Sequence, residues 1–361
     1  MRVTVVGAGI GGLAAAAGLH AAGHEVTVRE RAPGPATDGT ALGIWPAAVR
    51  ALDDLGLGPG LRAVSHPQAS GALCRPDGTR LARIDVRGEV HLVARPDLRT
   101  LLAGTLPGDT VRYGSPVAEA DLPALRDGCD LLVGADGLHG TTRTLLPGGD
   151  RVRPRRTGTV AYRGVATVTV GAGTETWGRG ARFGVLPHGP DGDRANWYAV
   201  LPSADAPPSP DPAADLALLR ERFGAWHDPV PRVLARIGTD GYLRHHLADL
   251  RPPRRYTDGR RVAVLGDAVH AMTPDLGQGA CQALLDGIAL ATAVTRSADL
   301  PSALRAYDRR RRPPTRRLVR LARAVHRVAQ ARRGTRLRDR AVSTLSALTP
   351  SSTARPAPSP H

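Results

Sequence analysis

The sequence has 361 residues, 42% of them hydrophobic and 3% aromatic, which is typical of a globular protein with one large domain or two ordinary ones. Its net charge of +16 is carried by arginine, because the chain contains no lysine, and this bias weakens any inference from charge to a nucleic-acid partner. Three widely spaced cysteines form neither a disulfide framework nor a metal-binding pattern, and no apolar stretch reaches the ~18 residues of a membrane-spanning helix. We therefore expect a cytoplasmic protein without a bound metal or a membrane span.

The first 30 residues predict a buried strand, a glycine turn, an Ala-rich helix and a second strand. In the turn "GAGIGG", Gly7 permits a tight bend, Gly9 lets a pyrophosphate approach the backbone, and Gly12 lets the helix pack closely on the strand. Glu30 follows Gly12 by eighteen residues and can accept hydrogen bonds from ribose hydroxyls. This segment predicts a dinucleotide site, but it does not decide which dinucleotide binds.

Two later segments, 129–143 and 261–272, each contain an apolar strand that ends in a Gly/Asp pair. The half-buried strands expected between them, at 159–170 and 197–202, indicate a mixed or antiparallel sheet. We therefore predict an α/β fold in which a Rossmann-like FAD-binding domain is assembled from discontinuous segments, with an inserted β-sheet substrate domain and a C-terminal helix. The expected boundaries are 1–70, 92–155 and 255–345 for the FAD-binding domain, 71–91 and 156–254 for the substrate domain, and 346–361 for a disordered tail.

The stretch "LGDAVHAMTPDLGQGACQALLDG", residues 265–287, favours a flavin as the dinucleotide. Asp267 follows a strand, where a carboxylate can hold a ribose or polyol hydroxyl. Pro274 turns the chain, and Gly277 and Gly279 then expose backbone N–H groups at the start of a helix. Such a helix start stabilises negative charge, and reduced flavin carries an anion along its N1–C2=O edge.

The C-terminal region is strongly basic, with fifteen arginines and two aspartates between residues 305 and 340. We expect the solvated face of a helix here. A patch for a polyanion or a membrane surface is the alternative. The apolar residues of this region recur at helical spacing and predict the face that packs on the core: Leu318, Leu321, Ala322, Val325, Val328 and Ala329.

Over roughly residues 1–330 the sequence resembles the FAD-dependent aromatic monooxygenases, which are class A flavoprotein hydroxylases of the para-hydroxybenzoate hydroxylase fold. The resemblance rests on "GAGIGG", "LVARPDLRTLL", "LLVGADGLHGTTR" and the 265–287 stretch, in this order. It is strongest to the small-ring hydroxylases typified by salicylate and urate hydroxylases, through "GIWPAAVRALDDLG", "YRGV" and "GARFGVLP".

The resemblance implies that the chain binds FAD and takes electrons from NADH or NADPH. One oxygen atom from O2 then enters a small aromatic or heteroaromatic substrate through a flavin C4a-hydroperoxide, as a hydroxylation or an epoxidation. An FAD-dependent reductase or dehydrogenase of the same fold, which inserts no oxygen, is the alternative. A third hypothesis is a basic protein that uses its arginine helix to bind nucleic acid or a membrane surface, which the ordered flavin motifs disfavour. We expect a monomer or homodimer.

The resemblance also assigns roles to individual residues. Gly9 lies on the pyrophosphate, Glu30 and Arg31 flank the adenosine ribose, and Asp267 binds the linker between the flavin ring and the phosphates. The other implied cofactor contacts are Gly7, Gly12, Gly43, Arg95, Val117, Asp136, Pro274, Gly277, Gln278, Gly279, Ala280 and Cys281. Val117 meets the adenine through its backbone, and Asp136 is linked to both FAD and NAD(P)H.

By the same resemblance, Arg182 and Asp275 activate the aromatic substrate. Asn196 stands where urate-type enzymes have a tyrosine, so urate itself is not expected as the substrate. Trp197 and Tyr198 follow in the same expected strand, where neighbouring side chains point to opposite faces. We therefore expect one of these two rings to face away from the pocket.

Overall fold

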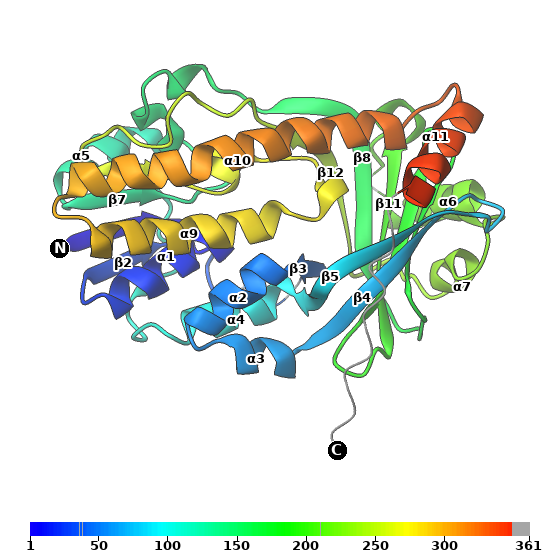
Figure 1. The fold of residues 1–361 in the computed structure, drawn as a ribbon, viewed down its shortest axis with the longest axis horizontal. Coiled ribbons are helices and arrows are strands. Elements are labelled where there is room, and N and C mark those ends of the chain that lie inside the picture. The colour runs from blue at the N-terminus through cyan, green and yellow to red at the C-terminus, as the bar shows by residue number, and fades with distance from the viewer. Residues whose placement is uncertain (36, 38, 210, 349–361) are drawn as a thin grey trace.

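Two β-sheets lie side by side in the computed structural model, which describes residues 1–35, 37, 39–209 and 211–348 (Figure 1). The first sheet is entirely parallel, in the order β13-β7-β1-β2-β6. Its strands are β1 (Arg2–Val6), β2 (Glu25–Arg29), β6 (Val111–Arg112), β7 (Leu131–Gly134) and β13 (Val262–Val264). These come from three distant parts of the chain, which confirms the predicted sheet of discontinuous segments.

The second sheet is mixed, in the order β12-β8-β11-β10-β9-β4-β5-β3, with β4 parallel to β9 and the other pairs antiparallel. Its strands are β3 (Ala41–Ile44), β4 (Ser65–Cys74), β5 (Arg80–Ala94), β8 (Arg155–Ala166), β9 (Gly173–Trp177), β10 (Arg182–His188), β11 (Arg194–Pro202) and β12 (Tyr242–Asp249). Strands β3 and β4 therefore belong to this sheet. The expected boundaries placed β3 and the residues of β4 up to 70 in the FAD-binding domain instead.

Helices cover one face of the second sheet and leave the other face toward the first sheet. α6 (Pro212–Phe223) and α7 (Val230–Leu234) share a core with the fully buried Trp197, which stacks on Phe183 with ring centroids 6.0 Å apart. Tyr198 is the next residue along β11 and points to the opposite face, where it lines a cavity. One ring of the pair thus faces away from the cavity, as the strand alternation predicts.

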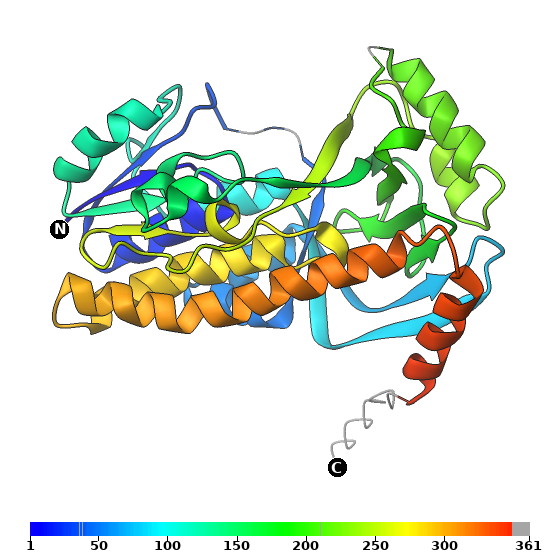
Figure 2. The ribbon, with the colours of Figure 1, turned by 90° about the horizontal axis from the view of Figure 1, so that it is seen from above.

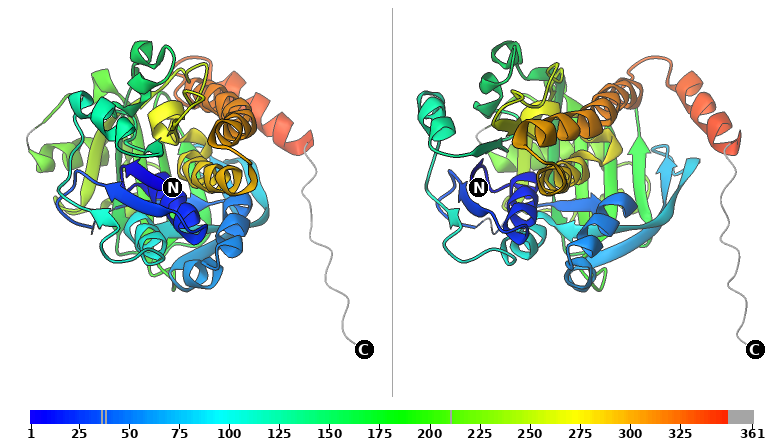
Figure 3. Two further views of the ribbon diagram at one scale, coloured as in Figure 1. Left: turned by 90° about the vertical axis from the view of Figure 1, so that its left-hand side faces the viewer. Right: turned by 60° about the vertical axis from the view of Figure 1, so that its left-hand side comes forward.

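The parallel sheet packs against α1 (Ile10–Ala21), α9 (Gly279–Arg296) and the 30-residue helix α10 (Leu300–Ala329). α1 and α9 approach so closely that a Cβ on Gly287 would lie 2.6 Å from the carbonyl oxygen of Gly11. Figure 3 shows α10 (orange) beside α9 (yellow). The remaining α-helices are α2 (Pro46–Asp54), α3 (Gly58–Ala63), α4 (Arg95–Ala103), α5 (Leu122–Asp127), α8 (Asp267–His270) and α11 (Thr335–Leu348).

Helix α10 runs from the parallel sheet to the second sheet (Figures 1 and 2). Its buried face differs from the predicted apolar stripe, because Leu321 and Val328 are 52% and 45% exposed. Ala322 and Ala329 of the stripe are buried, and the other buried positions between 311 and 329 are Arg311, Thr315, Val319 and His326. Three of these four are polar, since the helix covers polar loops as well as the apolar core. Hydrophobic periodicity alone cannot identify such a face.

Several arginines of the basic C-terminal region form ion pairs inside the molecule. Arg311 pairs with Asp286, Arg323 pairs with Asp249, and Arg338 pairs with its neighbour Asp339. Residues 346–348 complete α11 rather than joining the expected tail, and 349–361 lie outside the described residues. None of the helices in the described part of the chain is both long enough and apolar enough to cross a membrane.

Candidate active site

The glycine turn between β1 and α1 is tightly packed except at one position. A Cβ on Gly7, where φ is +106°, would lie 2.4 Å from the oxygen of Ala135, and a Cβ on Gly12 would lie 2.0 Å from the oxygen of Gly7. At Gly9, in contrast, no described atom lies within 4 Å of the Cβ position. α1 begins directly after Gly9, and no described side chain caps it. Its free N–H groups and the open space fit a pyrophosphate.

Glu30 lies beside this turn. Its Oε2 accepts a hydrogen bond from the backbone N–H of Ala8 at 2.8 Å, and its Oε1 accepts one from Ala32 at 2.9 Å. Each oxygen keeps a second lone pair for a ribose hydroxyl. Arg31 is exposed next to it, and Val117 is half-buried against the main core. The turn and the predicted ribose contacts are therefore close together.

Asp136 holds the loop that follows β7. Its carboxylate accepts hydrogen bonds from the backbone N–H groups of Thr141 and Thr142, at 2.6 and 2.8 Å, and from the Thr142 hydroxyl at 2.6 Å. Arg143 ties the same loop to α8 by donating to the oxygen of Ala268 at 3.3 Å. These contacts of Asp136 stay within its own loop. The sequence analysis did not identify the bridging role of Arg143.

The predicted flavin loop is joined to the start of α2. Trp45 Nε1 donates to the oxygen of Gly277 at 3.1 Å, and Cys281 Sγ donates to the oxygen of Gly43 at 3.2 Å. Burial raises the pKa of Cys281 to about 11, so the thiol keeps its proton. The loop begins with the exposed Pro274. Gly277 has φ of +59°, which suits glycine.

α9 begins at Gly279, and no described side chain caps its N-terminus after Gln278. The first turn, which contains Ala280 and Cys281, carries no acidic residue. No described atom lies within 4 Å of a Cβ placed on Gly279. The helix start therefore presents backbone N–H groups to open space, as the stabilisation of an anionic flavin edge requires.

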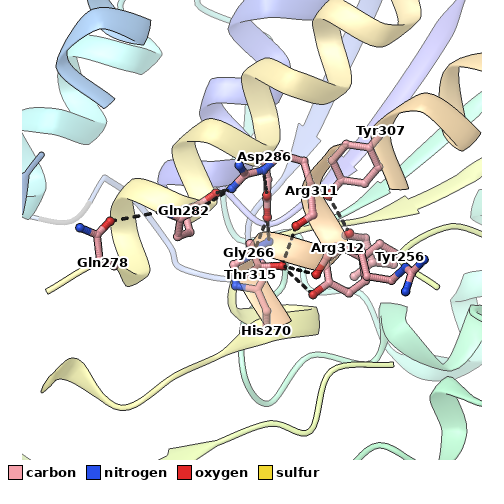
Figure 4. Close-up of polar contacts among 11 residues, drawn as sticks. Tyr256, Gly266, His270, Gln278, Gln282, Asp286, Tyr307, Arg311, Arg312 and Thr315 are labelled. Carbon is pink, nitrogen blue, oxygen red and sulfur yellow. Dashed lines mark hydrogen bonds and ion pairs between the residues drawn. The ribbon is translucent and has the colours of Figure 1, made fainter. Parts of the chain in front are cut away.

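A buried ionic cluster supports the loop that contains Asp267 (Figure 4). Asp286 Oδ2 accepts hydrogen bonds from the backbone N–H of Gly266 at 3.0 Å and from His270 Nε2 at 2.5 Å, and its Oδ1 accepts one from Arg311 Nε at 2.5 Å. Burial alone would raise the pKa of Asp286, but His270 and Arg311 outweigh it and lower the pKa. Asp267, next to Gly266, is exposed at the start of α8. The sequence analysis missed this cluster. Its one signal is an acid within the apolar face of α9.

Cationic side chains gather near Asp267. Arg95, at the start of α4, interacts with Asp267 and also lies near Arg163 of β8 and His245 of β12. Arg163 Nε is buried and has no hydrogen-bond partner among the described residues. Burial, and then Arg95, lowers the pKa of Arg163 to about 10, while burial, Arg163 and Arg95 lower the pKa of His245 to about 4. This excess of positive charge fits an anionic group such as a phosphate. The sequence analysis identified Arg95 but not Arg163 or His245.

A cavity of about 150 Å³ lies between the second sheet and Trp45. Because Trp45 also bonds Gly277, the cavity adjoins the predicted flavin loop. Its walls include the apolar side chains of Val90, Leu92 and Leu186. Its polar side chains include Glu175 and Tyr198. A small ring with one or two polar groups suits such a lining.

The predicted pair Arg182 and Asp275 is brought together next to this cavity. Arg182 Nη1 lies 2.8 Å from Asp275 Oδ1, and the two side chains are 2% and 0% exposed. Burial alone would raise the pKa of Asp275, but His326 and Arg182 lower it, so the carboxylate stays ionised. The Tyr198 ring lies 6.0 Å from the Arg182 guanidinium, in space that a side chain at Gly184 would fill.

Asn196 does not join this pair. Its Oδ1 accepts a hydrogen bond from the backbone N–H of Ala41 at 3.0 Å, which links β11 to β3. Tyr198, two residues further along the same strand face, lines the cavity. Glu175, Tyr198 and His326 surround the Arg182–Asp275 pair, and the sequence analysis gave none of them a defined role.

The sequence profile of the family described as FAD binding domain matches residues 1–106 and 125–322. The chain belongs to this family. Among its relatives, the aurachin C monooxygenase/isomerase of Stigmatella aurantiaca is 32% identical over 330 residues, covering 85% of this chain and 84% of that protein. The 3-amino-4-hydroxybenzoate 2-monooxygenase of Streptomyces cremeus is 32% identical, covering 90% of this chain and 88% of that protein.

A crystal structure of Klebsiella pneumoniae HpxO complexed with FAD and uric acid has the same fold as this family member, with a TM-score of 0.82 at 26% identity. The match covers 96% of this chain and 93% of HpxO. Together these similarities confirm the predicted resemblance to flavin monooxygenases, the α/β fold and FAD as the cofactor.

Proposed function

We propose that this protein is an FAD monooxygenase that takes electrons from NADH or NADPH and inserts one oxygen atom from O2 into a small aromatic or heteroaromatic compound. The observation that carries the proposal is the cavity beside Trp45. It adjoins the flavin loop through the Trp45–Gly277 hydrogen bond, and it lies next to the buried Arg182–Asp275 pair. Relatives named as monooxygenases support the same reaction class.

We further propose that the parallel sheet with α1 and α9 holds FAD, while the second sheet holds the substrate. The open position at Gly9 and the start of α1 would bind the pyrophosphate, and Glu30 with Arg31 would bind the adenosine ribose. Arg95 and Asp267 would hold the phosphates and the adjoining polyol, with Arg163 as an additional cation. When bound, FAD supplies the electron transfer and the oxygen activation.

The residues around the cavity position the ring and exclude water. Trp45 forms one wall and is itself fixed by Gly277 and Cys281. Arg182 and Asp275 neutralise each other in a buried place, so the loop that starts at Pro274 has one defined position against the second sheet. An apolar wall that excludes water protects reactive oxygen species from unproductive decay.

The first test is the visible absorption spectrum of the purified protein, followed by identification of the cofactor released on heating. FAD is expected. The second test uses ¹⁸O2 with NADH or NADPH and a panel of small phenols and heteroaromatic rings. Incorporation of one ¹⁸O atom into a product supports the proposal. Substrate-dependent NAD(P)H oxidation without any oxygen in the product would favour the alternative, an FAD-dependent reductase or dehydrogenase.

A further inference from the structure

Four ionisable side chains form a row that begins at the cavity and ends on α10. Arg182 Nη1 lies 3.1 Å from Glu175 Oε1 and 2.8 Å from Asp275 Oδ1. Both carboxylate oxygens of Asp275 lie 3.2 Å from Nδ1 of His326. The side chains of Arg182, Asp275 and His326 are at most 5% exposed, whereas Glu175 is 20% exposed. Glu175 is therefore the member of the row that a ligand in the cavity can reach.

His326 lies between the carboxylate of Asp275 and two threonines of β8. The Thr157 and Thr159 hydroxyl oxygens lie 2.6 Å apart, and Thr157 Oγ1 also lies 3.1 Å from the oxygen of Leu247. Thr159 Oγ1 lies 3.3 Å from His326 Nε2. His326 Nδ1 faces the carboxylate of Asp275 and donates to it. His326 therefore holds the loop of Asp275 against β8.

The row contains two carboxylates, Glu175 and Asp275, one permanent cation, Arg182, and one histidine, His326. Arg182 contacts both carboxylates, so its charge is already matched inside the protein. Glu175 Oε1 also accepts a hydrogen bond from Trp177 Nε1 at 2.9 Å, which fixes the carboxylate at the edge of the cavity.

Glu175 carries the one formal charge among the described residues that line the cavity. A ring carboxylate in this cavity would be desolvated beside another carboxylate, without a free cation to receive it. An uncharged ring that carries an O–H or N–H group would instead donate a charge-assisted hydrogen bond to Glu175. Such a bond also increases electron density in the ring, which favours attack by an electrophilic oxygen.

We propose that Glu175 determines the substrate class: it accepts a hydrogen bond from the O–H or N–H group of an uncharged aromatic ring, and the cavity excludes ring carboxylates. This inference rests on the proposed function, because it concerns the same cavity. Arg182, Asp275 and His326 act as positioning residues that hold the Glu175 carboxylate in one place.

The test compares three matched rings on the FAD-loaded protein: 2-naphthol, 2-methoxynaphthalene and 2-naphthoate. Binding is followed by calorimetry and by the change in flavin absorbance at neutral pH, where the naphthol is uncharged and the naphthoate is ionised. We expect 2-naphthol to bind about tenfold or more tightly than either of the others, which is the effect of one charge-assisted hydrogen bond. Equal or tighter binding of 2-naphthoate would overturn the proposal, as would the absence of binding by all three rings.

The Glu175→Gln variant provides a second measurement. It should bind 2-naphthoate about tenfold more tightly than the wild type does and lose most of the preference for 2-naphthol. Glu221→Gln is the matched control, because Glu221 is exposed on α6 on the other side of the sheet. An unchanged preference in Glu175→Gln would overturn the proposal. If that variant does not retain FAD, the wild-type comparison decides. Failure of the proposed function is distinguishable, because it would appear as a lack of FAD or of ¹⁸O incorporation.

Discussion

Arg311 and Asp286 form a buried ion pair between α10 and α9, with Nε and Oδ1 2.5 Å apart. Asp286→Asn removes the negative charge and leaves Arg311 buried without a counter-charge, so we expect a loss of about 3–5 kcal/mol in the free energy of unfolding. Urea denaturation of the apoprotein measures this loss. Asp53→Asn, which breaks the exposed pair with Arg62, is the control and should be close to wild type. A similar result for both variants would show that the buried cluster does not stabilise the fold.

The contribution of Asp286 to the free energy of unfolding should decrease as the pH falls into the acid range. Its pKa in the folded protein lies below the ordinary value of 3.8, because His270 and Arg311 outweigh the effect of burial. The stabilisation is therefore complete above pH 3.8 and disappears as the pH falls through the lower, folded value. We expect the difference in unfolding free energy between wild type and Asp286→Asn to be constant near neutral pH and to shrink in acid. A difference that grows on acidification would contradict this assignment.

Two glycines of the same turn should respond differently to alanine. Gly12→Ala places a methyl group 2.0 Å from the oxygen of Gly7, so the apoprotein should be destabilised. Gly9→Ala places a methyl group in open space, so the apoprotein should keep its stability and lose FAD affinity by about tenfold or more, because the methyl occupies the pyrophosphate position. Thermal unfolding of the apoproteins and titration with FAD separate the two effects. Wild-type FAD affinity in Gly9→Ala would place the pyrophosphate elsewhere.

His245 should couple FAD binding to proton uptake. Burial, Arg163 and Arg95 lower its pKa to about 4, from an ordinary value of 6.5, so it is neutral at physiological pH. A phosphate bound at this cluster would raise the pKa, and FAD affinity should then increase as the pH falls from 6.5 toward 4. FAD titrations of the apoprotein across this interval measure the effect. In His245→Gln the FAD affinity should change less with pH. An equal change with pH in both proteins would show that His245 does not lie in the cofactor site.

The sequence predicts those parts of the site that depend on neighbours in the chain. The spacing of Gly7, Gly9 and Gly12 and the order of Asp267 and Gly277 can each be interpreted from neighbouring residues alone. The residues that sequence reasoning missed have distant partners. His326 contacts Asp275, which lies 51 positions earlier in the chain, and Arg163 and His245 come from different strands. The polar face of α10 looks solvated in the sequence because its partners are loops from elsewhere in the chain.

The domain boundaries illustrate the same limit. β3 pairs with β5, and β5 pairs with β4 within the second sheet. Nothing in the local pattern of residues 41–74 reveals which of the two sheets these strands join. The choice depends on the parallel pairing of β4 with β9, whose residues lie about a hundred positions later in the sequence.

The packing of α9 on α1 also has a consequence for synthesis of the protein. The glycine turn leaves the ribosome first, but its helix is covered by a segment that begins at Gly279, and the edge strand of its sheet begins at Val262. The nascent chain must therefore hold an incomplete nucleotide site until β13 and α9 have been synthesised. Cofactor capture becomes a late event, and a truncated chain that ends before α9 would expose the apolar face of α1 to the cell's degradation machinery.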